Sequence, residues 1–187
     1  TSALQANTTA GNNVAVGAFS LKLTTTGSNN IGIGASALCT NVTGIKNIAI
    51  GTEALRYNTG SNNTAIGYVA LDANTTASNN TAVGESASGK NTTGAQNTTV
   101  GAGSFTCNTT GSNNTAIGQA ALESNTTGGS NTAVGRKTFE NVTTGSANVA
   151  IGICAGSDAS MINITTESNR FVAGHNDITN AYVKVDW

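Results

Sequence analysis

The chain repeats a unit of 17 residues, and each copy is marked by a Gly that follows a β-branched residue. This Gly occurs as Gly17, Gly34, Gly51, Gly67, Gly84, Gly101, Gly118, Gly135 and Gly152. Successive copies are 17 residues apart, except for a step of 16 residues between Gly51 and Gly67. A unit this short cannot bury an apolar face by itself, so the repeat predicts units that stack on one another.

Each unit has the pattern of one coil of a parallel β-solenoid. With the repeated Gly as position zero, positions −3 to −1 form a short strand, and position +4 is mostly Leu or Phe. Asn-Thr-Thr-Gly strings between these segments are typical of corners, because Asn and Gly tolerate a positive φ. The unit is too short for a βαβ crossover and lacks helical spacing. The chain has no Pro, as suits coils that donate backbone N–H groups to their neighbours. We predict an all-β parallel β-solenoid, or β-roll, of about nine coils.

Two invariant columns suggest what holds the coils together. Position −1 is always Val or Ile, and we predict that this column forms the core: Val16, Ile33, Ile50, Ile66, Val83, Val100, Ile117, Val134 and Ile151. Position −4 is always Asn, and stacked Asn side chains can form a hydrogen-bonded ladder that fixes the register. Its members are Asn13, Asn30, Asn47, Asn63, Asn80, Asn97, Asn114, Asn131 and Asn148. Two coils have Ser88 and Gly156 at position +4, and we expect looser packing there.

A single solenoid of this composition would have a thin core and a weakly charged surface. Thr, Asn and Gly supply 31, 26 and 23 of the 187 residues, whereas the chain has only 8 basic and 9 acidic side chains. Both features favour lateral association of several copies. We predict a homotrimer that associates through the columns at positions −2 and −3.

The repeat stops after Gly152, which divides the chain into a solenoid shaft or head at 1–156 and a distinct β-rich C-terminal cap or tip at 157–187. Alternating apolar and polar residues predict strands within 169–176 and 181–187, separated by a turn-rich segment. Three residues beside that turn, His175, Asn176 and Asp177, are the candidate receptor contacts.

The repeated string Asn-x-Ala-Ile-Gly, as in 63–67 and 114–118, resembles the head repeat of trimeric autotransporter adhesins. The 17-residue form with Asn-Thr-Thr-Gly corners is more similar to bacteriophage tail fibres. The strings at 169–172 and 178–183, followed by Trp187, resemble the part of those fibres that precedes a self-cleaving intramolecular chaperone. This resemblance covers nearly the whole chain. It implies a trimeric fibre fragment without its chaperone, located in a virion tail or on an extracellular surface, with a host-surface glycan or protein as receptor.

Composition and motif spacing argue against several other classes of protein. Few basic residues disfavour a nucleic-acid partner, and no apolar run approaches the roughly 20 residues needed to insert through a membrane. Cys39, Cys107 and Cys154 contain no Cys-x-x-Cys pair, and no calcium-binding repeat is present. We therefore predict no metal, no cofactor and no enzymatic activity.

One pair of carboxylates could still suggest chemistry. Glu123 and Glu140 both occupy position +5 of adjacent coils, so stacking would bring them to about 5 Å, near the separation in a retaining glycosidase. We interpret them as solvated side chains on a rod, because no aromatic platform for a sugar is evident beside them.

Three functions stay open at this point. The first is a structural fibre or adhesin that attaches to a host surface as a rigid trimeric rod. The second is a self-polymerising, curli-like extracellular filament, in which open solenoid ends stack through unpaired backbone groups. The third is an ice-binding solenoid, although Thr occupies position −3 in only five coils.

Overall fold

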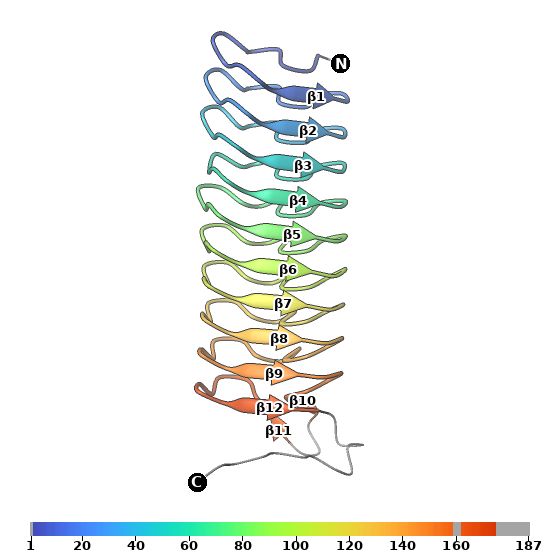
Figure 1. Cartoon of the computed structure of the whole chain (residues 1–187), viewed down its shortest axis with the longest axis vertical. Coiled ribbons are helices and arrows are strands. Elements are labelled where there is room, and N and C mark those ends of the chain that lie inside the picture. The colour runs from blue at the N-terminus through green and yellow to red at the C-terminus, as the bar shows by residue number, and fades with distance from the viewer. Residues whose placement is uncertain (1, 159–161, 175–187) are drawn as a thin grey trace, which may run out of the picture.

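The computed structural model describes residues 2–158 and 162–174. These residues form a parallel β-solenoid, as predicted, and contain no helix. One sheet contains ten strands in the order β1-β2-β3-β4-β5-β6-β7-β8-β9-β12, and it runs the length of a slender stack (Figure 1). The strands are β1 (Val14–Val16), β2 (Ile31–Ile33), β3 (Ile48–Ile50), β4 (Thr64–Ile66), β5 (Thr81–Val83), β6 (Thr98–Val100), β7 (Thr115–Ile117), β8 (Thr132–Val134), β9 (Val149–Ile151) and β12 (Phe171–Ala173).

Equivalent positions of the repeat stack above one another throughout the sheet. In β7 and β8, for example, Thr115 pairs with Thr132 and Ile117 pairs with Val134. The 16-residue step does not disturb this register, because Ile48 still pairs with Thr64 and Ile50 with Ile66. The missing residue is therefore absorbed in the corner, where Asn58-Thr59-Gly60 replaces the usual four-residue string.

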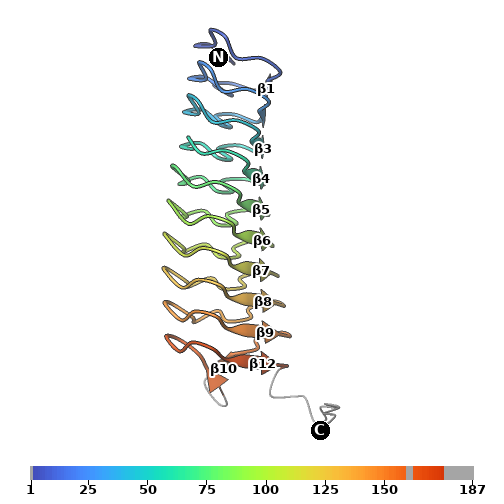
Figure 2. The same cartoon turned by 60° about the vertical axis from the view of Figure 1, so that its left-hand side comes forward.

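The stack continues past residue 156. The described residues after it include a short antiparallel pair, β10 (Ser157–Asp158) with β11 (Ile162–Asn163). The chain then rejoins the sheet, because β12 pairs in parallel with β9 and places Phe171 beside Val149. Figure 2 shows β12 in line with the other strands and β10 to one side. A separate C-terminal unit stays a prediction, and its proposed second strand at 181–187 lies outside the described residues.

The prediction that position −1 forms the core is wrong. The side chains of this column point away from the core, and seven of the nine are between 37 % and 56 % exposed. The column comprises Val16, Ile33, Ile50, Ile66, Val83, Val100, Ile117, Val134 and Ile151. Strand side chains alternate between two faces, so positions −3 and −1 share one face and position −2 takes the other.

The core lies between position −2 and position +4 of each coil. Position −2 is mostly Ala, and position +4 supplies the largest buried side chains, including Leu122, Phe105 and Phe139. The segment after each strand folds back so closely behind it that only a small side chain fits at position −2. The Ala column, which we expected to contact a partner, is therefore the inner wall of the coil.

In the two coils that we expected to pack loosely, side chains of neighbouring coils occupy the space at position +4. A Cβ built on Gly156 would lie 2.4 Å from the Phe139 ring, so the aromatic side chain already occupies the space of the usual Leu. The Ser88 hydroxyl lies 3.0 Å from the Thr99 hydroxyl, and both side chains are buried. Thr99 replaces the usual Ala at position −2, so the two polar substitutions satisfy each other.

The segment that folds back behind each strand contains residues in the left-handed backbone conformation. Positions +2 and +4 have a positive φ in every coil from Gly17 to Gly152, even where the residue is Leu, Val or Phe. Position zero has a backbone conformation that is still less accessible to other residues. Gly118 has φ 130°, and a Cβ there would lie 2.4 Å from the Gly135 carbonyl oxygen. Only Gly can meet both conditions, which explains why this position is invariant.

Candidate functional site

The column of Asn residues at position −4 forms a buried ladder along the stack. In each step the backbone N–H of one Asn donates to Oδ1 of the Asn one coil earlier, as Asn131 does to Asn114 at 2.9 Å. The side-chain amide of Asn114 then donates to the Gly128 carbonyl oxygen at 3.0 Å. The steps run from Asn13 to Asn148 and end at the backbone N–H of Arg170.

A second Asn ladder lies at position +7, in residues for which the sequence pattern predicts only corners. Here the side-chain amide of one Asn donates to Oδ1 of the previous one, as Asn91 does to Asn74 at 2.9 Å. The ladder joins Asn58, Asn74, Asn91, Asn108 and Asn125. Their repeated spacing is the signal in the sequence that could reveal the ladder, and the structure adds that all five side chains are buried.

The second ladder stops where the sequence changes. Asn125 Oδ1 is buried without a hydrogen-bond partner, because Val142 occupies the next position +7. Asn41 Oδ1 is also buried and unpaired, and it lies next to the coil with the shortened corner. The two orphaned oxygens thus lie where the +7 ladder is interrupted, beside the shortened corner and before Val142.

Side chains at positions −3 and −1 form a continuous outer surface on the sheet, which we call the strand face. The β-branched column at −1 lies beside a column at −3 that begins with Val14, Ile31 and Ile48, continues with Thr on β4–β8, and ends with Val149 and Phe171. Phe171 is 72 % exposed, which makes it the most exposed large apolar side chain in the described part of the chain. No charged residue occupies either column.

Charged side chains of the shaft gather instead on what we call the turn face, the outward positions +1, +2, +5 and +6 of each coil. Between residues 14 and 152, every Lys, Arg, Asp and Glu except Lys46 lies at one of these positions. The charges are therefore kept off the strand face along its whole described length.

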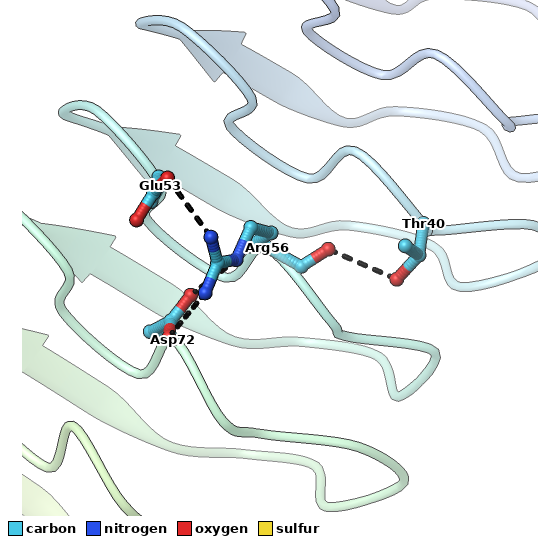
Figure 3. A network of polar contacts seen from close by, with 4 residues as sticks. All are labelled: Thr40, Glu53, Arg56 and Asp72. Carbon is cyan, nitrogen blue, oxygen red and sulfur yellow. Dashed lines mark hydrogen bonds and ion pairs between the residues drawn. The ribbon is translucent and has the colours of Figure 1, made fainter.

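A network of charged groups on the turn face joins two coils beside the shortened corner (Figure 3). Arg56 binds Asp72 in the next coil through Nε–Oδ1 at 3.0 Å and Nη2–Oδ2 at 3.1 Å, and its Nη1 lies 2.9 Å from Glu53 Oε1. Thr40 extends the network backwards, because its hydroxyl donates to the Arg56 carbonyl oxygen at 2.9 Å. Burial raises the pKa of the Asp72 carboxyl, although the attraction of Arg56 opposes this shift. The network joins neighbouring coils. Its four residues, all within the described part of the chain, offer neither a vacant position for a metal ion nor an activated nucleophile.

The two carboxylates singled out for chemistry lie at equivalent positions of adjacent coils, where the Ser124 backbone N–H donates to the Glu140 carbonyl oxygen at 3.1 Å. Glu140 accepts a hydrogen bond from Lys137 Nζ at 2.8 Å, and this contact raises the pKa of the lysine. Glu123 lines a shallow groove and has no such partner. The three cysteines are free thiols. The predicted receptor contacts His175, Asn176 and Asp177 lie outside the described residues.

Over the described ranges, no three His, Cys, Asp or Glu side chains gather as metal ligands. The same part of the chain offers no helix with the length and apolarity to cross a bilayer. No protein-family model, curated protein or solved structure matches the chain. The strand face and the turn face are thus the surfaces from which a function can be argued.

Proposed function

We propose that the chain is the rod of a homotrimeric fibre or adhesin, belonging to a phage tail or a similar extracellular appendage, in which the strand faces of three copies meet. The observation that carries this proposal is the uncharged, exposed strand face, which has β-branched side chains on β1–β9 and continues to Phe171 on β12. An apolar patch of this extent on a soluble protein marks an interaction surface.

A second copy of the same chain is the occupant that best fits this face. Stacked coils repeat every ~4.8 Å, so a second rod presents side chains at the same spacing and can follow the face from end to end. In a parallel arrangement, Thr meets Thr along β4–β8 and apolar rows meet apolar rows elsewhere. Each β-branched side chain removed from water contributes about 1 kcal/mol, given its partial exposure.

In this arrangement the turn face points outward. Placing the charges of the shaft on that face keeps the assembly soluble while the strand face stays dry. The rod would hold its ends at a fixed distance and present a host-surface receptor site, as the resemblance to tail fibres implies.

The oligomeric mass of the chain tests this proposal. We expect light scattering to give one mass of three copies, constant over a wide range of protein concentration. A folded monomer would overturn the proposal. Mass that grows with concentration would instead support the self-polymerising filament, in which coils stack end to end.

Ice binding is kept as a second candidate because of one specific observation. Five consecutive strands, β4–β8, place Thr at position −3 beside Ile or Val at position −1 on the same flat face. Such a regular array could order water only if the face stays uncovered, so it competes with the trimer. Faceted growth of an ice crystal in a supercooled solution of the protein would favour this candidate.

A further inference from the structure

We propose that the turn face carries a saccharide-binding groove on the four coils that contain Glu85 to Lys137. It deepens the proposed attachment function, on which its biological setting rests, by assigning a receptor class and a place on the shaft. The groove has a volume of about 360 Å³. Its lining spans three steps between coils, which is roughly 14 Å along the rod at a rise of about 4.8 Å per coil.

The groove exists because side chains are missing from its floor. Positions +1 and +2 are occupied by Ala102 and Gly103 in one coil, and Ala120 takes position +2 in the next. The same two positions carry Phe19 and Tyr68 in other coils. A ligand can therefore approach the backbone here more closely than elsewhere on the same columns.

The fold does not require the smallest of these residues. A Cβ on Gly103 would meet only the Thr106 hydroxyl, at 3.8 Å. Its φ of 67° does not require Gly either, because Phe19, with φ 60°, and Ser36, with φ 58°, occupy the same position +2. The absence of a side chain at 103 thus opens the surface without serving the packing of the coil.

Two carboxylates in the groove lack the partners that other carboxylates on this face have. Within the described ranges, neither Glu85 nor Glu123 forms a side-chain hydrogen bond or an ion pair. Glu53, in contrast, is bound by Arg56, and Glu140 is bound by Lys137. The groove therefore presents unused hydrogen-bond acceptors at two separate points.

The lining suits a short oligosaccharide. Ionised carboxylates only accept hydrogen bonds, and they bind donors more strongly than neutral acceptors do. A sugar chain supplies hydroxyl donors along its length, and its C–H faces can lie on the methyl groups of Ala102 and Ala120. Ser86 and Gln119 add groups that can both donate and accept. A basic peptide fits less well, because Lys137 also lines the groove and adds a positive charge at its edge.

Binding of the full chain to an array of bacterial surface oligosaccharides tests the proposal. We compare the native protein with Gly103→Phe, which fills the groove, and Glu123→Gln, which removes one carboxylate. Ser36→Phe is the matched control, since it adds the same ring at the same position of a coil outside the groove. We expect the native protein and S36F to bind the same glycans, and G103F and E123Q to bind at least tenfold more weakly.

Several outcomes would overturn the proposal that the groove binds a saccharide. These are an array with no bound glycan, binding that G103F leaves unchanged, or preferential binding of a pentalysine probe. The mass of each variant is measured separately by light scattering. A trimeric protein that binds no glycan would refute the saccharide-binding groove but not the proposed fibre. Glycan binding by a monomeric protein would refute the trimeric fibre but not the groove.

Discussion

At the scale of single residues, the Asn ladder at position −4 contributes more to the stack than its exposed neighbours do. Asn114 Oδ1 accepts from the Asn131 backbone N–H, and its amide donates to a corner carbonyl. Both contacts are buried, so no water can replace a lost partner without a cost. A polar side chain here is thus part of the interior and holds one coil to the next.

Asn114→Ala should lower the free energy of unfolding by about 1 to 3 kcal/mol, because it leaves the buried Asn131 N–H unpaired. It also removes one of the two side-chain amides that donate to the Gly128 carbonyl oxygen. Thr127→Ala is the control, since Thr127 is exposed in the neighbouring corner, and we expect a change within about 0.5 kcal/mol. Urea unfolding followed by circular dichroism measures both. Equal losses in the two variants would contradict the role given to the ladder.

Gly118→Ala should be far more damaging than its size suggests. The new Cβ would lie 2.4 Å from the Gly135 carbonyl oxygen, at a φ that L-residues avoid, so the loss should be about 3 kcal/mol or more. Gly103→Ala makes the same chemical change in open space at φ 67°, and should cost only about 1 to 2 kcal/mol, the cost of a left-handed L-residue. Melting temperatures of the two variants should therefore differ widely, and similar values would refute this account of position zero.

At the scale of one coil, a three-residue strand is too short for its apolar pattern to show which side is buried. Ile117 looked like core in the sequence because it is large and apolar, and Ala116 looked like a contact surface because it is small. The close fold-back reverses both assignments. That fold-back relies on left-handed Leu and Phe residues, such as Leu122 with φ 53°, which no propensity would predict. Period and register were predictable because they depend only on repetition.

The last described coil should respond to acid through Glu167. Its pKa is lowered because the backbone N–H groups of Thr165 and Thr166 donate to the carboxylate. A lowered pKa in the folded state means that the ionised form stabilises the coil above the unfolded pKa, and that this contribution is lost as pH falls through the folded value. We expect faster amide exchange at 165 and 166, relative to the intrinsic rate, below about pH 4.

Glu167→Gln provides the comparison for this effect. The variant keeps an acceptor oxygen but has no carboxyl proton to gain, so exchange at 165 and 166 should lose its dependence on acid. An acid response of equal size in the variant would assign the effect to another group.

At the scale of the whole molecule, two adjacent substitutions separate folding from assembly. Ala116→Asp places a charge in the buried wall of a coil, and we expect loss of the folded state, because a buried unpaired charge costs several kcal/mol. Ile117→Asp places the same charge on the strand face, where the side chain is 39 % exposed. We expect the I117D protein to keep its β-sheet circular dichroism and to lose its trimeric mass.

The two measurements in this comparison are independent of each other. If I117D stayed trimeric, the strand face could not be the contact surface. If I117D unfolded as A116D does, the assignment of the two columns to opposite faces would fail. The sequence favours lateral association but does not fix the surface or the number of copies, because a face that binds a copy and a face that fills a core use the same residue types.

The direction of the hydrogen bonds has a mechanical consequence. The backbone hydrogen bonds between coils and both Asn ladders run along the rod. Tension applied at the ends of the rod would therefore break the hydrogen bonds of one coil before those of the next. A single rod should then unwind at low force in steps of one repeat. Three rods held together by their strand faces would share that load, because a coil could not open without also detaching from its neighbours.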